Sequence, residues 1–206
     1  MRILFTRHGE SEANIQRIIS NRGLPHHLTP VGVSQSIAIA ESLVNLDIKK
    51  VISSPILRAK ETGTIIAEKL GVPFIITNAL REFDCGIMEG RGDDEAWIAH
   101  NAAIQAWDER QDYSFRIPPD GESFDDVKAR FLPFTTKLIE TDGDIVGDIL
   151  LVSHGSMLSL MLPLVLVNIN RTFTKQHPLG NCKLVVTQSQ GARLVCTNWA
   201  GISLLG

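Results

Sequence analysis

The sequence predicts an α/β fold in three layers, in which a mostly parallel central sheet lies between helices on both faces. Short apolar runs, typical of buried strands, alternate along the 206 residues with longer segments that have the apolar spacing of helices. The composition, 44% hydrophobic and 21% charged, is ordinary for a soluble globular chain with a sizeable core. No internal repeat or linker interrupts it, so we expect a single domain over residues 1–206.

The first half of the chain predicts three strands and three helices. In chain order they are expected at residues 3–5, 10–20, 31–46, 51–52, 56–70 and 74–76. The negative charge of Glu10 is favourable near the N-terminus of the first helix, which is the positive end of the helix dipole. Thr29 and Pro30 begin the second helix as an N-cap and a proline at the first helical position. The expected apolar face of this second helix is Val33, Ile37, Ala40 and Val44.

Residues 80–121 differ from the rest, because they combine glycines and a Pro-Pro loop with Trp97, Trp107 and Tyr113. We expect them to leave the core, to contain a helix over 94–107 and to cover a site. The remaining elements are a helix at 122–139, a strand at 149–152, a helix at 155–166 and a closing hairpin at 183–187 and 193–198.

Charge and cysteine content exclude several classes of partner. A net charge of −3 provides no basic field for nucleic acid or anionic lipid. The cysteines, Cys85, Cys182 and Cys196, are odd in number and far apart, which favours free thiols over disulfides or a zinc site. The apolar stretch 156–167 is too short to span a bilayer, and too few apolar residues follow Arg2 for a signal peptide. We therefore expect a soluble cytoplasmic protein.

Polar residues follow three of the expected strands. They are Arg7-His8, Ser53-Ser54-Pro55 with Arg58, and Ser153-His154-Gly155. Since ligands of α/β sheets bind beyond the carboxyl ends of the strands, these side chains should meet in one positively charged pocket. An arginine offers a rigid fork that matches a phosphate, and a neutral histidine has a ring nitrogen with a free lone pair. Together they could hold a phosphoryl group and attack it.

The strand-end residues belong to a longer ordered set of motifs. These are Arg7-His8-Gly9-Glu10-Ser11 with Asn14; Leu28-Thr29-Pro30 with Gly32 and Gln35; Ser53-Ser54-Pro55 with Arg58, Ala59 and Thr62; Leu80-Arg81-Glu82 with Gly86 and Glu89-Gly90; Gly121-Glu122-Ser123; and Val152-Ser153-His154-Gly155. The set resembles the histidine phosphatase superfamily, also called the phosphoglycerate mutase-like family, over nearly the whole chain. The resemblance implies a phosphoglycerate mutase-like fold.

The resemblance also implies the chemistry. His8 would be the nucleophile and form a phosphohistidine, while Arg7, Arg58 and His154 hold the phosphoryl oxygens. Glu82 would protonate the leaving oxygen and then activate water, which requires burial to raise its pKa. A hydrogen bond from one ring nitrogen of His8 to a backbone carbonyl would fix its tautomer. The candidate phosphate- or substrate-binding residues are Asn14, Ser20, Asn21, Arg22 and Gly155. No metal or cofactor is expected.

The function expected from this resemblance is that of an acid-type phosphatase on a small phosphorylated metabolite. Cofactor-dependent mutases of the family carry Glu-Arg-x-Tyr-Gly after the catalytic glutamate, whereas here Glu82 precedes Phe83-Asp84-Cys85-Gly86. A mutase, a phosphoprotein phosphatase and a non-catalytic binding protein remain alternatives. Pro25-His26-His27 and Met88 depart from the family pattern near the pocket mouth and leave the substrate open. The roles of His26, His27 and Cys85 stay open too, as does the choice between monomer and homodimer.

Overall fold

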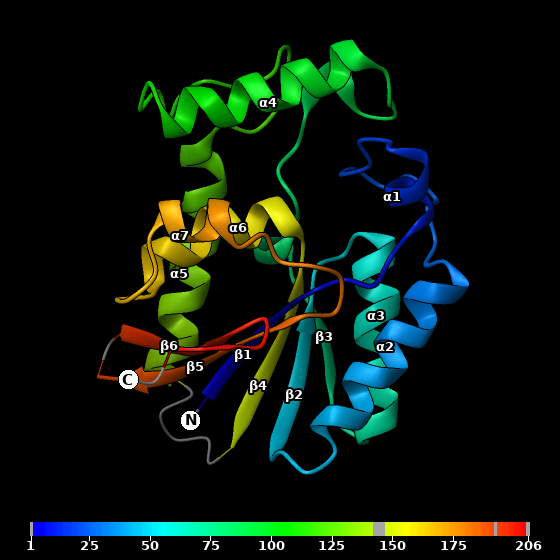
Figure 1. Ribbon diagram of the computed structural model, residues 1–206, viewed down its shortest axis with the longest axis vertical. Helices are drawn as coiled ribbons and strands as arrows, with labels where there is room; N and C mark the ends of the chain where they lie inside the picture. The colour runs from blue at the N-terminus through cyan, green and yellow to red at the C-terminus, as the bar shows by residue number, and fades with distance from the viewer. Residues whose placement is uncertain (1, 142–146, 192, 205–206) are drawn as a thin grey trace.

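In the computed structural model, which describes residues 2–141, 147–191 and 193–204, a seven-stranded sheet has the order β3-β2-β4-β1-β5-β6-β7 (Figure 1). The strands β1 to β4 run parallel to one another, and β5 and β6 add an antiparallel hairpin beside β1. Their bounds are Arg2–Arg7 (β1), Ile48–Ser53 (β2), Phe74–Ile76 (β3), Asp148–Ser153 (β4), Leu184–Gln190 (β5), Arg193–Trp199 (β6) and Ile202–Ser203 (β7). The predicted α/β class with a mostly parallel core is confirmed.

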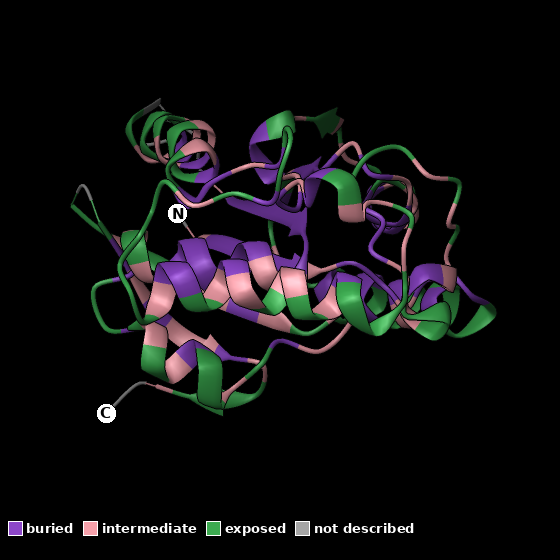
Figure 2. Cartoon of the chain, turned by 90° about the horizontal axis from the view of Figure 1, so that it is seen from above, coloured by how far each residue is buried: buried purple, intermediate pink, exposed green. Residues whose placement is uncertain are grey.

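Helices cover both faces of the sheet, because successive strand residues point to opposite sides. Along β1, Ile3 and Phe5 belong to one apolar cluster, and Leu4 belongs to a second. The second cluster is completed by α2 (Pro30–Leu43) and α3 (Leu57–Leu70), and the first by α5 (Phe124–Thr141) and α6 (Gly155–Val165). Figure 2 shows buried strands at the centre and exposed residues on the outer sides of the helices.

Three further helices and two short 3-10 turns complete the fold. They are α1 (Glu12–Gln16), α4 (Asp94–Asp108), α7 (Arg171–Gln176), η1 (Asn78–Leu80) and η2 (Gly86–Met88). In Figure 1, α1 and α4 lie beyond the carboxyl ends of the parallel strands, so α4 and its flanking loops cross above that edge of the sheet. Within the described residues, no helix has the length and apolar character needed to cross a membrane.

Two local predictions were wrong. The first helix was expected over residues 10–20 but ends at Gln16, because Arg17 adopts a left-handed conformation with φ of 54°. In α2, Val33, Ile37 and Val44 are exposed. The buried side consists of small residues with two larger apolar ones: Gly32, Ser36, Ile39, Ala40 and Leu43.

A close approach of two backbones explains why small residues of α2 face inward. A Cβ on Gly32 would lie 2.0 Å from the carbonyl oxygen of Glu10, and a Cβ on Gly9 would lie 2.5 Å from the carbonyl oxygen of Gly32. The amide of Glu10 also donates to Gln35 Oε1 at 2.9 Å. The N-terminal turn of α2 therefore packs directly on the loop that follows β1.

Replacing Gly32 with alanine should destabilise the protein, because the new Cβ would overlap the carbonyl oxygen of Glu10. Overpacking of this kind costs about 1–3 kcal/mol, so thermal unfolding should begin several degrees lower. Gly23→Ala is the matched control, since a Cβ there would meet no atom within 4 Å. Equal unfolding temperatures for the two variants, measured by circular dichroism, would contradict this packing.

Candidate active site

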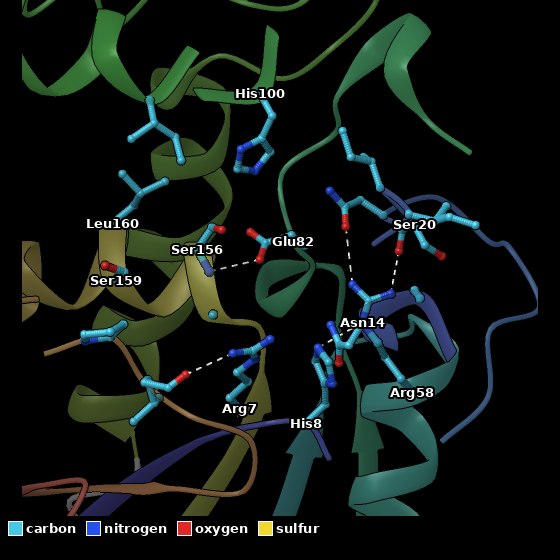
Figure 3. A pocket seen from close by; sticks show the side chains of 18 of the residues that line it. Arg7, His8, Asn14, Ser20, Arg58, Glu82, His100, Ser156, Ser159 and Leu160 are labelled. Carbon is cyan, nitrogen blue, oxygen red and sulfur yellow. Dashed lines mark hydrogen bonds between the residues drawn. The ribbon is translucent and has the colours of Figure 1, made fainter. Parts of the chain in front are cut away.

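A pocket of about 370 Å³ lies at the carboxyl ends of the parallel strands (Figure 3). Strand register explains its position: Arg7 pairs with Ser153 and Ser53 with Val152, so the residues after β1, β2 and β4 meet at one edge. Eight of the ten predicted site residues line the pocket: Arg7, His8, Asn14, Ser20, Asn21, Arg58, Glu82 and Gly155. His154 lies fully buried beside them, with its ring centroid 5.1 Å from that of His8.

The tautomer of His8 is fixed by its own backbone neighbourhood. Nδ1 lies 2.6 Å from the carbonyl oxygen of Gly9, which can only accept, so Nδ1 carries the proton. Nε2 is left with its lone pair, which accepts from Arg58 Nε at 2.9 Å. Burial first, and then the charges of Arg58 and Arg7, hold the pKa of His8 well below its usual value. His8 is therefore neutral at physiological pH, with Nε2 as its basic atom.

Arg58 is a buried cation without a carboxylate partner among the described residues. Its Nη1 donates to the carbonyl oxygen of Ser20 at 2.5 Å, and Nη2 donates to Asn21 Oδ1 and His154 Nδ1, both at 3.3 Å. Burial lowers the pKa of this guanidinium to about 10. A charge held only by neutral acceptors leaves an uncompensated positive field in the pocket.

Arg7 has an unused donor. Its Nη1 donates to the carbonyl oxygen of Leu179 at 3.2 Å, but the buried Nε meets no hydrogen-bond partner in the described part of the chain. Gly155 faces this guanidinium and carries no side chain that could cover Nε. Because an unsatisfied buried N–H costs about 1–3 kcal/mol, its presence in a pocket points to an acceptor that binds there.

His154 faces Arg58 from the other side. It accepts from Arg58 through Nδ1, so its proton lies on Nε2, which donates to Ser54 Oγ at 2.8 Å. Burial is the largest cause that holds its pKa well below the usual value, followed by the charge of Arg58. Ser54 thus fixes the orientation of this ring.

Glu82 is the acidic residue of the pocket and is only 6% exposed. Its carboxylate accepts from the backbone N–H of Phe83 at 3.2 Å and of Ser156 at 3.1 Å. Burial nevertheless raises the pKa of Glu82, because the hydrogen bonds and the charge of Arg58 compensate for only part of the lost hydration. Glu82 can therefore carry a proton at a higher pH than an exposed glutamate.

The remaining predicted residues differ in their surroundings. Asn14 Oδ1 accepts from the backbone N–H and the hydroxyl of Ser11, so its amide donors are left for the pocket. Arg22 does not line the pocket, because it pairs with Asp84 at 2.6 Å and Asp120 at 2.8 Å.

Cys85 and His26 lie outside the pocket and contact two residues that line it. The buried thiol of Cys85 has a raised pKa, chiefly through burial, and accepts from Asn21 Nδ2 at 3.5 Å. His26 Nδ1 lies 2.8 Å from Ser20 Oγ. Both contacts hold the segment that supplies the oxygen acceptors of Arg58.

Sequence reasoning missed the outer wall of the pocket. It is formed by residues of α1, α4, α6, α7 and their neighbouring loops: Ala13, Ile18, Ile19, Trp97, His100, Ile104, Ser156, Ser159, Leu160, Arg171, Pro178 and Leu179. The aromatic residues at 97–113 indicated a cover, but not which side chains face inward. In the part of the chain that the structure describes, no group of three or more His, Cys, Asp or Glu side chains could hold a metal ion.

An α/β sheet with a cationic, histidine-bearing pocket at its carboxyl edge defines a class of protein built to bind a small anion. A family model of the histidine phosphatase superfamily (branch 1) matches residues 3–201. The chain therefore belongs to the histidine phosphatase superfamily, as its motifs predicted.

Individual relatives include phosphatases and mutases. A glucosyl-3-phosphoglycerate phosphatase of Mycolicibacterium vanbaalenii is 30% identical over 165 residues, which cover 78% of this chain and 72% of that protein. A 2,3-bisphosphoglycerate-dependent phosphoglycerate mutase of Methylobacterium sp. is 31% identical over 166 residues, 78% of each chain. A bifunctional protein of Mycobacterium tuberculosis is 36% identical over 166 residues, and the match spans only 44% of its length.

Solved structures share the fold. A mycobacterial glucosyl-3-phosphoglycerate phosphatase in complex with VO3 superposes with a TM-score of 0.80 at 24% identity, over 96% of this chain and 98% of that one. At this identity the likeness supports the architecture alone.

Orthophosphate should stabilise the protein, because its oxygens can accept from Arg7 Nε and Arg58. A ligand at a hundred times its Kd contributes about 2.7 kcal/mol, which raises the unfolding temperature by several degrees. Arg7→Gln should abolish most of this rise. Arg116→Gln, at an exposed ion pair with Asp126, serves as the control and should keep it. An equal phosphate effect in the Arg7 variant, measured by differential scanning fluorimetry, would show that the anion binds elsewhere.

Proposed function

We propose that this protein is a metal-independent phosphomonoester hydrolase that acts through a phosphohistidine on a small phosphorylated metabolite. The observation that carries this proposal is the state of His8. Its Nδ1 proton is held by the Gly9 carbonyl, and its unprotonated Nε2 faces a pocket that contains Arg58 and an unsatisfied donor of Arg7. A neutral nucleophile beside uncompensated cations suits attack on an anionic phosphoryl group.

In the first step, the phosphate oxygens replace His8 as acceptors of Arg58 and thereby free the Nε2 lone pair. Nε2 attacks phosphorus in line with the scissile P–O bond. The N–P bond forms as the P–O bond breaks, and the leaving oxygen takes the proton of Glu82. Arg7, Arg58 and the amide of Asn14 stabilise the charge on the equatorial oxygens. His154, whose two ring nitrogens are engaged by Arg58 and Ser54, positions Arg58 and does not donate to the phosphoryl group directly.

In the second step, Glu82 is ionised and takes a proton from water as the water oxygen attacks phosphorus. The N–P bond breaks, its electron pair returns to Nε2, and inorganic phosphate leaves. Glu82 is then protonated again, so one residue serves as acid and base in turn. The raised pKa of Glu82 and the lowered pKa of His8 suit these roles.

A small substrate is supported by the way in which α4 closes the pocket. Near its N-terminal end, Trp97 Nε1 donates to the carbonyl oxygen of Arg17 at 2.8 Å. At its C-terminal end, Asp108 accepts from Arg171 through two hydrogen bonds of 2.8 and 3.0 Å. Because α4 is fixed at both ends above the pocket, the site has room for a small metabolite rather than for a phosphorylated protein segment.

Phosphoglycerate mutase is the second candidate, because relatives with that name are as similar to this chain as the phosphatase relative is. A mutase must keep water away from its phosphohistidine and return the phosphoryl group to a second hydroxyl. Incubation with 3-phosphoglycerate in EDTA, with and without a bisphosphate primer, distinguishes release of phosphate from isomerisation.

His8→Ala should reduce phosphate release by at least about 10³-fold, because it removes the nucleophile. The fold should persist, since the backbone contacts of residue 8 remain. His27→Gln, at an exposed histidine paired with Glu61, is the control and should retain turnover. The measurement is phosphate release in EDTA together with trapping of the phosphohistidine from 32P-labelled ester. Retained turnover in His8→Ala would refute the proposed nucleophile.

The pH profile of kcat/KM should report the ionisation of the ester on its acidic side and that of Glu82 on its alkaline side. The pKa of His8 is well below its usual value near 6.5, so His8 stays neutral as the pH falls. The acidic limb near pH 6 should therefore reflect the second ionisation of the phosphate ester, whose pKa is about 6. As the pH rises, loss of the Glu82 proton at its raised pKa should slow alkyl esters but not p-nitrophenyl phosphate, whose leaving group needs no proton.

Glu82→Gln tests the alkaline limb directly. This variant should lose far more activity on alkyl esters than on p-nitrophenyl phosphate. Equal losses on both esters would exclude the acid role of Glu82.

A further inference from the structure

The wall of the pocket opposite His8 is the part that the leaving group of a substrate must contact. In-line transfer places the leaving oxygen on the far side of phosphorus from His8 Nε2, beside Glu82. In Figure 3, Glu82 lies between His8 and His100, which points into the pocket from α4. The polar residues of this wall include His100, Ser156, Ser159 and Arg171, and its apolar residues include Trp97, Ile104 and Leu160.

His100 presents a hydrogen-bond acceptor to this space. Its Nδ1 lies 3.3 Å from Asn101 Oδ1, which can only accept, so Nδ1 carries the proton and Nε2 keeps its lone pair. The ring stacks on Phe83 with centroids 5.1 Å apart and meets the edge of Trp97 at 5.2 Å. Burial lowers its pKa, so the ring stays neutral.

Ser159 presents a donor. Its Oγ accepts from Arg171 Nη1 at 2.6 Å, so the hydroxyl proton is available to a ligand. The guanidinium of Arg171 is paired, because Asp108 accepts from its Nε and Nη2 at 2.8 and 3.0 Å. Lys175 lies 3.5 Å from the same carboxylate but does not line the pocket. Among the described residues that line the pocket, the arginines without a carboxylate partner are Arg7 and Arg58, on the phosphate side.

We infer that the leaving group of the physiological substrate is an uncharged polyol. One of its hydroxyls donates a hydrogen bond to His100 Nε2, and another accepts a hydrogen bond from the Ser159 hydroxyl. This inference rests on the proposed hydrolase function and specifies its substrate class. Hydroxyls match a wall with one acceptor and one donor, and the apolar side chains can cover a carbon skeleton. A carboxylate, as in a phosphoglycerate, would face the lone pair of His100 without a cation to compensate it.

The matched pair of glycerol 3-phosphate and 3-phosphoglycerate tests this inference on the wild-type protein, because the two esters differ only at one terminal carbon. The wild type should show a kcat/KM at least about tenfold higher for glycerol 3-phosphate, since an unpaired charge in a closed site is costly. p-Nitrophenyl phosphate provides the reference rate. Phosphate release is measured in EDTA for all three esters.

Variants of the wall test the residues. His100→Phe keeps an aromatic ring beside Phe83 but removes the acceptor, and it should lower the ratio of kcat/KM for glycerol 3-phosphate over p-nitrophenyl phosphate by about tenfold. Ser159→Ala should lower the same ratio, and His100→Gln, which keeps an acceptor, should restore part of it. Ile98→Ala, on the exposed side of α4, is the control that should not change the ratio.

Three outcomes separate the possibilities. A preference for 3-phosphoglycerate would overturn the inference and leave the hydrolase intact. An unchanged ratio in both His100→Phe and Ser159→Ala would equally overturn it. Absence of phosphate release from every ester, p-nitrophenyl phosphate included, would refute the proposed function and this inference with it.

Discussion

The burial of the Arg58 guanidinium is the constraint on which the rest of the site depends. Burial of a charge is costly unless acceptors surround it, and here the acceptors are Ser20, Asn21, His8 and His154 rather than a carboxylate. The segment that carries Ser20 and Asn21 must therefore be held in place. Glu89 does this from behind, because its carboxylate accepts from the backbone N–H of Asn21 at 2.8 Å and of Cys85 at 3.1 Å. The cation keeps its charge available because its partners are neutral.

The same burial moves the pKa values of the nucleophile and the acid in opposite directions. Exclusion of water disfavours the charged form of both groups, so the pKa of His8 falls and that of Glu82 rises. Arg58 adds to the effect on His8 and opposes it on Glu82, where burial remains the larger cause. His8 consequently stays neutral, and Glu82 keeps its proton to a higher pH than an exposed glutamate, so the arginines are the charges that attract a dianionic ester. A site with this arrangement has its acid and base assigned by environment rather than by residue type.

The fold and the substrate preference are carried by different parts of the chain. The sheet edge supplies Arg7, His8, Arg58 and His154, and related proteins named as a phosphatase and as a mutase share this family. Membership of the family therefore does not decide which leaving group the enzyme accepts. The wall built from α4, α6 and α7 is where such a difference can arise, because those side chains face the leaving group. Among the described residues, its polar side chains are a neutral histidine, serine hydroxyls, an arginine already paired with Asp108, and the indole N–H of Trp97, which donates to Arg17.

By itself, the sequence determined the fold class, the order of most strands and helices, and the residues that gather at the sheet edge. These depend on local signals: apolar runs, caps such as Thr29-Pro30, and polar residues directly after strands. Tertiary structure decided what depends on contacts between distant segments. The inward face of α2 follows from the approach of Gly32 to Glu10, against the apolar periodicity. Arg22 pairs with Asp84 and Asp120, and His100 and Ser159 line the same pocket, although no local pattern connects these residues. Only the folded chain brings them together.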